Sequence, residues 1–216
     1  MKKALFSIDE RKKVVFSRGN LQYRDLNYKW RFAEHQYDYI GKGCENAAHD
    51  EWIDLLQWQR ANSFWDEIEG GEGCTHWRLL NQCEWGYLFF ERETQSGISY
   101  VGAKVHGVNG LILVPDDWDG SDYEFVNANN YRASYNDNVI SDAQWELLEQ
   151  EGLAFLPAAG YECAGVAQVG EQGTYWTSSP MGGEGGMHFV FFEENFFIDE
   201  LEREFGCSVR LVRRSR

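Results

Sequence analysis

The sequence predicts an α+β fold in which short helices lie around antiparallel sheets. Strand-like segments occur at both ends of the chain, and a few capped helical segments lie between them without regular strand–helix alternation. Glycine is frequent and proline rare, 22 against 3, which is typical of many short strands joined by tight turns. With 216 residues, 43% of them hydrophobic, we expect a single domain over residues 1–216 with a substantial core.

The N-terminal region predicts a pair of strands, Lys13–Ser17 and Trp30–Ala33, with turn residues between them. The next apolar segment runs from Trp52 to Trp65. Its apolar residues approximate one helical face before the pattern decays near Asn62, so we expect a short helix or helical turn there.

A capped helix is predicted over about 82–91. Asn81 is a good N-cap, and Glu84 stands three residues later, where it completes a capping box. Trp85, Leu88 and Phe89 then share one face of this helix. A second helix, Asp142 to Gln150, is predicted from Ser141 as its N-cap, and a hairpin with a buried second strand is predicted over 97–117.

Residues 116–138 are acidic, rich in asparagine and without periodicity, which predicts a loop. The acidic side chains between 116 and 124 offer oxygen ligands for calcium, but their spacing does not match an EF-hand loop. A solvated acidic loop is therefore the preferred interpretation, calcium is the alternative, and no metal site is assigned.

The C-terminal segment 175–212 contains strand-like runs with apolar residues on both faces. Successive side chains of a strand point to opposite sides of a sheet, so one face suffices for a core. We assign Val190, Phe192 and Phe197 to the interior, together with Val209 and Leu211. The other face is then left with an unexplained set of aromatic and apolar side chains.

Composition limits the partners. A net charge of −15 argues against a nucleic-acid groove, which needs a concentrated basic surface. No apolar run is long enough to cross a bilayer, and the basic start lacks the apolar centre of an export signal. Localisation therefore stays open: inside a cell or virion, or exported by a segment that this sequence lacks. The five cysteines are widely spaced without a CxxC, which favours free, buried thiols.

Several segments together resemble a known family. RLLNQCEWGYLFFER (Arg78–Arg92) resembles a signature of the formylglycine-generating-enzyme branch of the C-type lectin fold, and GCSVRLV (Gly206–Val212) resembles the closing strand of that branch. VFSRGNLQY, WRFAEHQYDYIG, GVNGLILVPDDW, FLPAAGY and YWTSS are similar to paralogous proteins of gut Bacteroidetes and Fibrobacter with this fold. The resemblance implies a C-type lectin-like fold from about Val14 to Val212.

This family includes enzymes, lectin-like binders and the variable proteins of diversity-generating retroelements. The oxidase members carry paired reactive cysteines near the C-terminal strands, whereas this sequence offers only the isolated Cys163 and Cys207 there. We therefore expect a non-enzymatic binder without cofactor, whose partner is a protein or cell-surface ligand. An oxidase or its inactive relative is the alternative, and a self-associating surface protein is a further one.

In the retroelement variable proteins, the C-terminal strands display the ligand-binding residues. The corresponding candidate ligand-binding residues here are those assigned to the outward side or rim of the C-terminal strands: His188, Phe189, Phe191, Phe196, Ile198, Glu200 and Glu184. Exposed aromatic rings ringed by acidic groups would suit an apolar and basic protein partner, or an oligomer interface. The alternative is that another layer of the chain, such as the 116–138 loop, covers the phenylalanines as ordinary core.

Overall fold

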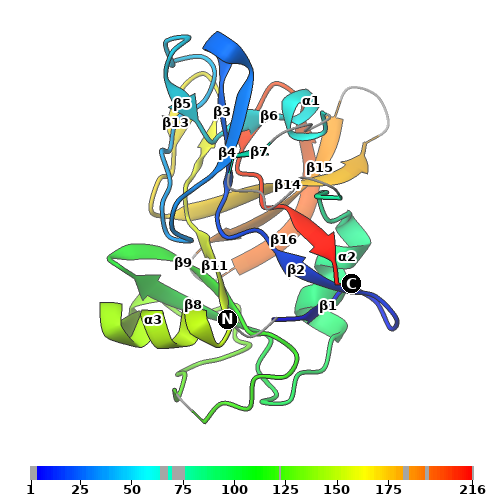
Figure 1. Cartoon of the computed structure of the whole chain (residues 1–216), viewed down its shortest axis with the longest axis vertical. Helices are drawn as coiled ribbons and strands as arrows, with labels where there is room; N and C mark the ends of the chain where they lie inside the picture. Colours follow the sequence, from blue (N-terminus) through cyan, green and yellow to red (C-terminus); the bar gives the residue numbers. More distant parts are fainter. Residues whose placement is uncertain are drawn as a thin grey trace.

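The computed structural model describes residues 4–63, 68–69, 76–121, 123–181, 185–192 and 195–215. The fold is α+β, with small, mostly antiparallel sheets and a few short helices. Figure 1 shows β14–β16 across the middle of the molecule, β3–β5 on one side of them, and β8, β9, β11 and α3 on the other. The central sheet has the order β14(Gln172–Pro180)–β15(Gly185–Phe192)–β16(Asn195–Glu202).

The other sheets are short. In sheet order, they are β1(Phe6–Ser7)–β2(Lys13–Phe16)–β18(Val212–Arg214); β5(Trp52–Ile53)–β3(Leu21–Arg24)–β4(Lys29–Phe32)–β7(Ile68–Glu69); β13(Val166–Ala167)–β12(Tyr161–Glu162)–β17(Gly206–Cys207)–β6(Leu56–Gln57); and β10(Val139–Ile140)–β8(Tyr100–Val105)–β9(Val108–Leu113)–β11(Ala154–Pro157). The helical segments are η1(Asp25–Asn27), α1(Trp58–Ala61), α2(Gln82–Gly86), the π-helical turn η2(Tyr87–Glu91), η3(Tyr135–Asp137) and α3(Asp142–Gln150).

Both longer predicted helices are confirmed. Asn81 accepts a hydrogen bond from the Glu84 backbone while the Glu84 carboxylate accepts one from the Asn81 backbone, so the predicted capping box forms at α2. Arg78 reinforces it with two hydrogen bonds to the same carboxylate, at 2.6 and 2.8 Å. Ser141 and Gln144 form the equivalent box at α3. Both helices therefore begin where their cap residues predict.

The predicted hairpin is also confirmed, as β8 and β9 with Lys104 opposite Asn109 in antiparallel register. Residues 111–113 of its second strand and Val114 directly after it are buried, as expected. Trp145 and Leu148 of α3 pack on this sheet, where the Trp145 ring meets Phe155 of β11 edge-on at 5.8 Å. Apart from η3, the described residues of the 116–138 segment form turns and irregular structure, as predicted, although Trp118 and Phe125 are buried.

The predicted pairing of the two N-terminal strands is wrong, although both strands are present. The segments 13–16 and 29–32 are strands, but they do not pair with each other: β2 lies between β1 and β18, whereas β4 pairs with β3 and β7. The reason is a strand at 21–24, within the predicted turn region, which forms a hairpin with β4 through η1.

The predicted helical turn within 52–65 shortens to α1, preceded by β5 and β6; residues 64 and 65 lie outside the described ones. Between those strands, the carboxylate of the fully buried Asp54 accepts hydrogen bonds from the backbone of Ile40 and Lys42. This carboxylate holds residues 52–57 against the loop at residues 40–42. Residues 52–57 therefore form short strands, although their apolar spacing resembles that of a helix.

In the described part of the chain, the core consists of three clusters. One lies between α2–η2 and one face of the central sheet, the second lies between β3–β5 and the opposite face, and the third lies under α3. Tyr175 and Phe189 belong to the first cluster and Trp176 to the second, so neighbouring residues of β14 contribute to different clusters. Strands β14 and β15 are therefore largely buried on both sides, whereas most residues of β16 are exposed.

Candidate functional site

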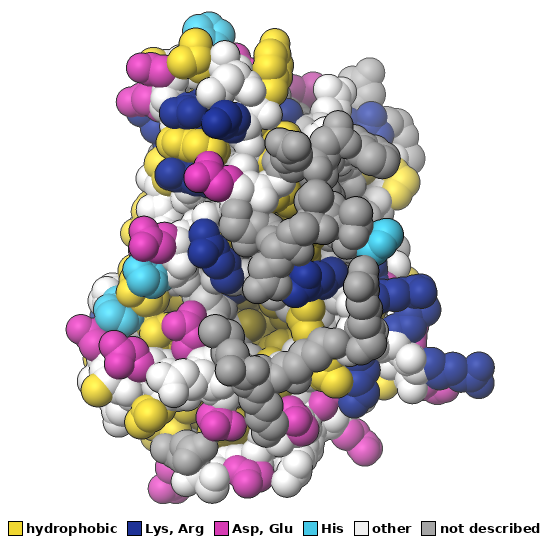
Figure 2. All heavy atoms as spheres, viewed as in Figure 1, with side chains coloured by type: hydrophobic (Ala, Val, Ile, Leu, Met, Phe, Trp, Pro, Cys, Tyr) yellow, Lys and Arg dark blue, Asp and Glu magenta, His cyan; other side chains and the backbone are white. Residues whose placement is uncertain are grey.

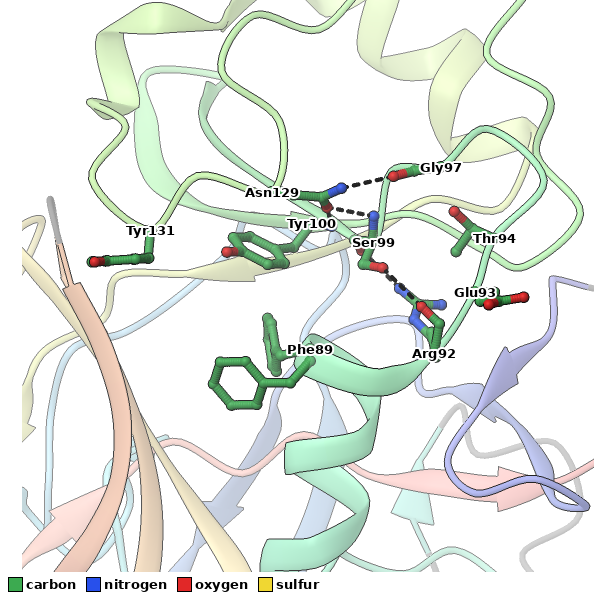
Figure 3. Close-up of a pocket in the computed structure, with 10 residues that line it drawn as sticks. Phe89, Arg92, Glu93, Thr94, Gly97, Ser99, Tyr100, Asn129 and Tyr131 are labelled. Carbon is green, nitrogen blue, oxygen red and sulfur yellow. Dashed lines mark hydrogen bonds between the residues drawn. The ribbon is translucent and has the colours of Figure 1, made fainter.

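A cleft of about 610 Å³ opens beside the end of η2, where the helical segment turns into the loop that leads to β8 (Figure 3). Side chains from η2, from this loop, from β8 and from the loop around residue 130 surround it: Phe89, Phe90, Arg92, Glu93, Thr94, Gly97, Ser99, Tyr100, Asn129 and Tyr131. We call it the aromatic cleft, because tyrosine and phenylalanine rings form one end of it.

At the aromatic end of the cleft, all four rings contact Phe196 of β16. Phe89 and Phe90 lie 5.3 Å from it, Tyr100 meets it edge-on at 5.0 Å and Tyr131 edge-on at 6.3 Å, all between ring centroids. These separations are typical of favourable aromatic pairs. Phe90 and Tyr131 remain 65% and 48% exposed, so two large ring surfaces face solvent over a buried aromatic base.

The helix pattern explains why Phe90 is exposed. Trp85, Leu88 and Phe89 lie on the buried face of α2–η2, as predicted from their spacing. The next residue along the helical segment is Phe90, which leaves that face and contacts solvent and the Phe196 ring. Phe89 and Phe90 both line the cleft, but Phe89 is buried and also belongs to the core, whereas Phe90 is exposed.

Arg92 fixes the polar end of the cleft. Its buried guanidinium donates to the Leu88 carbonyl at 2.9 Å, to the Ser99 carbonyl at 2.7 Å and to the Asp116 carboxylate at 3.3 Å. Burial lowers the pKa of Arg92 to about 10, while Asp116 opposes this shift, so Arg92 is charged at neutral pH. It ties the end of η2 to the start of β8.

Asn129 fixes the wall of the cleft that residues 97–99 form. Its backbone has a positive φ of 57°, its side-chain oxygen accepts a hydrogen bond from the Ser99 backbone at 2.7 Å, and its amide donates to the Gly97 carbonyl at 2.7 Å. Figure 3 shows these bonds, with Tyr100 and Tyr131 on one side of the cleft and Phe89 on the other. The cleft is therefore held by internal hydrogen bonds.

Among the described residues, the hydroxyls of Tyr100 and Tyr131 and the exposed carboxylate of Glu93 make no hydrogen bond. Burial raises the pKa of Tyr100 to about 12, so its phenol is a hydrogen-bond donor at neutral pH. The cleft thus offers ring faces at one end and polar groups that a ligand can use. This combination suits non-covalent binding of a ligand with a flat apolar surface and a few polar groups.

The predicted orientation of the C-terminal strands is wrong. Phe189 and Phe191 are each 1% exposed, and Phe189 stacks on Trp85 at 4.9 Å and on Phe89 at 4.6 Å. Phe197, assigned to the interior, is 38% exposed, and Phe192 is partly exposed. Alternation identifies which residues share a face, but here both faces of β15 are covered, and α2–η2 supplies the rings against Phe189. Val190, Val209 and Leu211 are buried as predicted.

The remaining candidate residues are dispersed. His188 is 7% exposed and lies on the face opposite Phe189, against Trp176. Ile198 packs partly buried on the first core cluster, and Glu200 is exposed on β16. Glu184 lies outside the described residues. Of the predicted set, Phe196, 9% exposed, does not line the aromatic cleft itself but packs behind four of the rings that do.

Phe90, Tyr100 and Tyr131 were not predicted as site residues. Phe90 had a detectable signal, since it is an aromatic residue one position off the apolar face of a well-defined helix. Tyr131 had none, because it stands in an irregular loop whose path the local sequence does not determine. The expected cover for the phenylalanines is found in part: α2–η2 covers Phe189, while Tyr131 of the 116–138 segment contacts Phe196 and Tyr135 of the same segment belongs to the core cluster of these rings.

The acidic loop and the cysteines have simple roles in the described part of the chain. Asp116 accepts hydrogen bonds from Ser7 and pairs with Lys13 at 2.8 Å, and no group of three or more metal-binding side chains is found among the described residues. Asp122 lies outside them.

Cys44, Cys83, Cys163 and Cys207 are free. Cys83 and Cys163 are exposed, so the expectation of buried thiols is wrong for these two.

Comparison with protein-family models, with curated proteins and with solved structures found no match to this chain. In the described residues, no helix has the length and apolar character needed to cross a membrane.

Proposed function

We propose that this chain is a non-enzymatic ligand-binding protein built on a C-type lectin-like scaffold, with the aromatic cleft as its binding site. The α+β fold and the motif resemblance along the chain support the scaffold. The observation that carries the site is the pair of exposed rings, Phe90 and Tyr131, around the buried ring of Phe196. Exposed aromatic surface over a rigid base is typical of binding sites, because ring burial contributes much of the affinity.

The partner is a protein or a cell-surface ligand that presents a flat apolar group to these rings. Phe90 and Tyr131 provide the stacking surfaces, and the phenols of Tyr100 and Tyr131 with the Glu93 carboxylate provide polar contacts beside them. A retroelement variable protein is the more specific form of this proposal. Its test is the neighbouring DNA, where a reverse-transcriptase gene and a near-repeat of the 3′ end of the coding sequence are expected.

The binding site is tested by screening a displayed peptide library and a panel of soluble oligosaccharides against the whole chain. Affinities of the hits are then measured for Phe90→Ser and Tyr131→Ser. Each loses an exposed ring, so we expect about tenfold or greater loss of affinity with little change in melting temperature. Leu147→Ser is the matched control, because Leu147 is a similarly exposed apolar residue on α3, at 59%.

The proposal fails if no hit is obtained, or if hits bind both ring variants as tightly as the wild type. Phe191→Ser separates binding from folding, since that buried ring should lower stability strongly and is not part of the cleft.

A further inference from the structure

The outer face of sheet β5–β3–β4–β7 carries a group of cations. The inner face is packed on the second core cluster through Tyr23, Trp30 and Ile53. On the outer face, Arg24 stands opposite Lys29 on one side and opposite Trp52 on the other. Arg31 follows on the same face of β4, opposite Gln22 and Glu69. Figure 2 shows Lys and Arg side chains beside hydrophobic ones over the part of the molecule where β3–β5 lie.

Trp52 holds two of these cations. The guanidinium carbon of Arg31 lies 4.0 Å from the centre of the Trp52 ring, and that of Arg24 lies 4.9 Å from it. Arg31 also donates from Nε to Gln22 at 2.7 Å, and Arg24 donates from Nε to Asn27 at 3.3 Å. Each guanidinium is therefore fixed by a ring and one hydrogen bond, and its two terminal nitrogens make no hydrogen bond to the described residues.

This arrangement is electrostatically unfavourable without a ligand. Like charges directly opposite each other in an antiparallel pair destabilise a sheet, and Arg24 and Lys29 are such a pair. Arg24, Lys29 and Arg31 form no ion pair within 4.0 Å in the described part of the chain. Glu69 and Glu34 raise the pKa of Arg31, but burial and the charge of Arg24 outweigh them and lower it. A chain with net charge −15 thus places these three cations together on one face, with the Glu69 carboxylate opposite Arg31 but not within 4.0 Å of it.

We propose that this face is a second binding site, which binds an oxyanion group of a ligand between the free guanidinium nitrogens of Arg24 and Arg31, with Lys29 beside them. Fixed guanidinium groups bind carboxylate, sulfate and phosphate through paired, charge-assisted hydrogen bonds. Lys29 is exposed and adds a mobile positive charge. The site is independent of the aromatic cleft.

The ligand carries one such group or a few, not a long polyanion. A polyanion would have to extend beyond three cations over a chain of strongly negative net charge, where repulsion opposes binding. Carboxylate, sulfate and phosphate share the required chemistry, so the experiment compares all three.

The whole chain is titrated with acetate, sulfate or phosphate at constant ionic strength while the NMR signals of the arginine Nε–H groups are followed. We expect saturable shifts of the Arg24 and Arg31 signals, with a dissociation constant on the order of 1 mM for at least one anion. Arg24→Gln should weaken binding about tenfold, because it removes charged donors. Arg214→Gln is the control, since it removes an equal charge from exposed Arg214 on β18, and it should bind as the wild type does.

Trp52→Leu gives a second, independent readout. Without the ring, the guanidinium groups lose their fixed position, so the affinity should fall although all three cations remain. The proposal is overturned if the shifts are linear and equal to those with chloride, or if Arg24→Gln and Arg214→Gln bind the anions equally.

Discussion

At the scale of single residues, His188 shows how burial changes the behaviour of a titratable side chain. His188 carries a titratable ring, yet it lies at 7% exposure against Trp176, where its Nδ1 has no hydrogen-bond partner in the described part of the chain. Burial lowers the pKa of His188, and a hydrogen bond with the Asp199 backbone and the charge of the Asp199 carboxylate oppose this effect only in part. The ring is therefore neutral in the folded state at neutral pH.

Protonation of His188 should make stability depend on pH. The folded-state pKa is below the unfolded value of about 6.5, so above that pH the ring is neutral in both states. As the pH falls below about 6.5, the unfolded chain takes up the proton first, and stability is lost by at most about 1.4 kcal/mol per pH unit. His188→Leu should reduce this slope in urea unfolding measured between pH 7 and pH 5.

His76→Gln is the control for that measurement, because His76 is exposed and its side chain makes no hydrogen bond or ion pair with the described residues. An unchanged slope in His188→Leu would contradict the assignment.

At the scale of elements, the Phe191 side chain of β15 lies over Gly173 of the neighbouring strand β14, so this position admits only glycine. A Cβ atom on Gly173 would lie 2.2 Å from the ring of Phe191, which stands opposite it in register. The Phe191 ring cannot move aside easily, since it is fully buried and stacks on Tyr175 at 6.0 Å. The Phe191 ring occupies the space that a side chain at position 173 would take.

Gly173→Ala should therefore destabilise the protein by about 1–3 kcal/mol, through overpacking. Gly86→Ala is the matched control: Gly86 lies in α2, no atom lies within 4 Å of the position that an alanine methyl group would take, and alanine favours helices, so stability should rise by up to about 1 kcal/mol. Thermal or urea unfolding of both variants checks this pair. Similar stability changes in the two would contradict the packing explanation.

Elements whose signals are local could be predicted from the sequence. The caps of α2 and α3 lie within a few residues of each other, and the β8–β9 hairpin is closed by its own turn. The pairing of β2 with β18 joins the two ends of the chain, and the orientation of β15 depends on a helix about 100 residues earlier in the sequence. The aromatic cleft was missed for the same reason, because distant segments meet at Phe196.

Across the whole molecule, one buried amide joins distant segments. Gln36 donates to Glu149 and to the Leu153 carbonyl, both at 3.0 Å, and its oxygen accepts from the Phe155 backbone at 2.8 Å and from Arg210 at 2.6 Å. Arg210 is fully buried, and burial lowers its pKa to about 10. This network links the N-terminal segment, α3, β11 and the C-terminal segment.

Gln36→Met should destabilise the protein by about 3–5 kcal/mol, because it leaves the buried charge of Arg210 and the Phe155 backbone without their partner. Arg210→Met should cost less, since it removes the buried charge itself. The double variant should be no less stable than Gln36→Met alone. A double-mutant cycle by urea unfolding measures the coupling, and a smaller loss for Gln36→Met than for Arg210→Met would contradict this account.

The position of β16 at the end of the central sheet has a consequence for solubility. In the described part of the chain, one edge of this strand has no partner strand, and such an edge is a template for association with another chain. Asp199, Glu200 and Glu202 are exposed along it. Because these like charges repel each other between copies, we expect the acidity of this edge to oppose the addition of strands from neighbouring molecules and so to limit edge-to-edge aggregation.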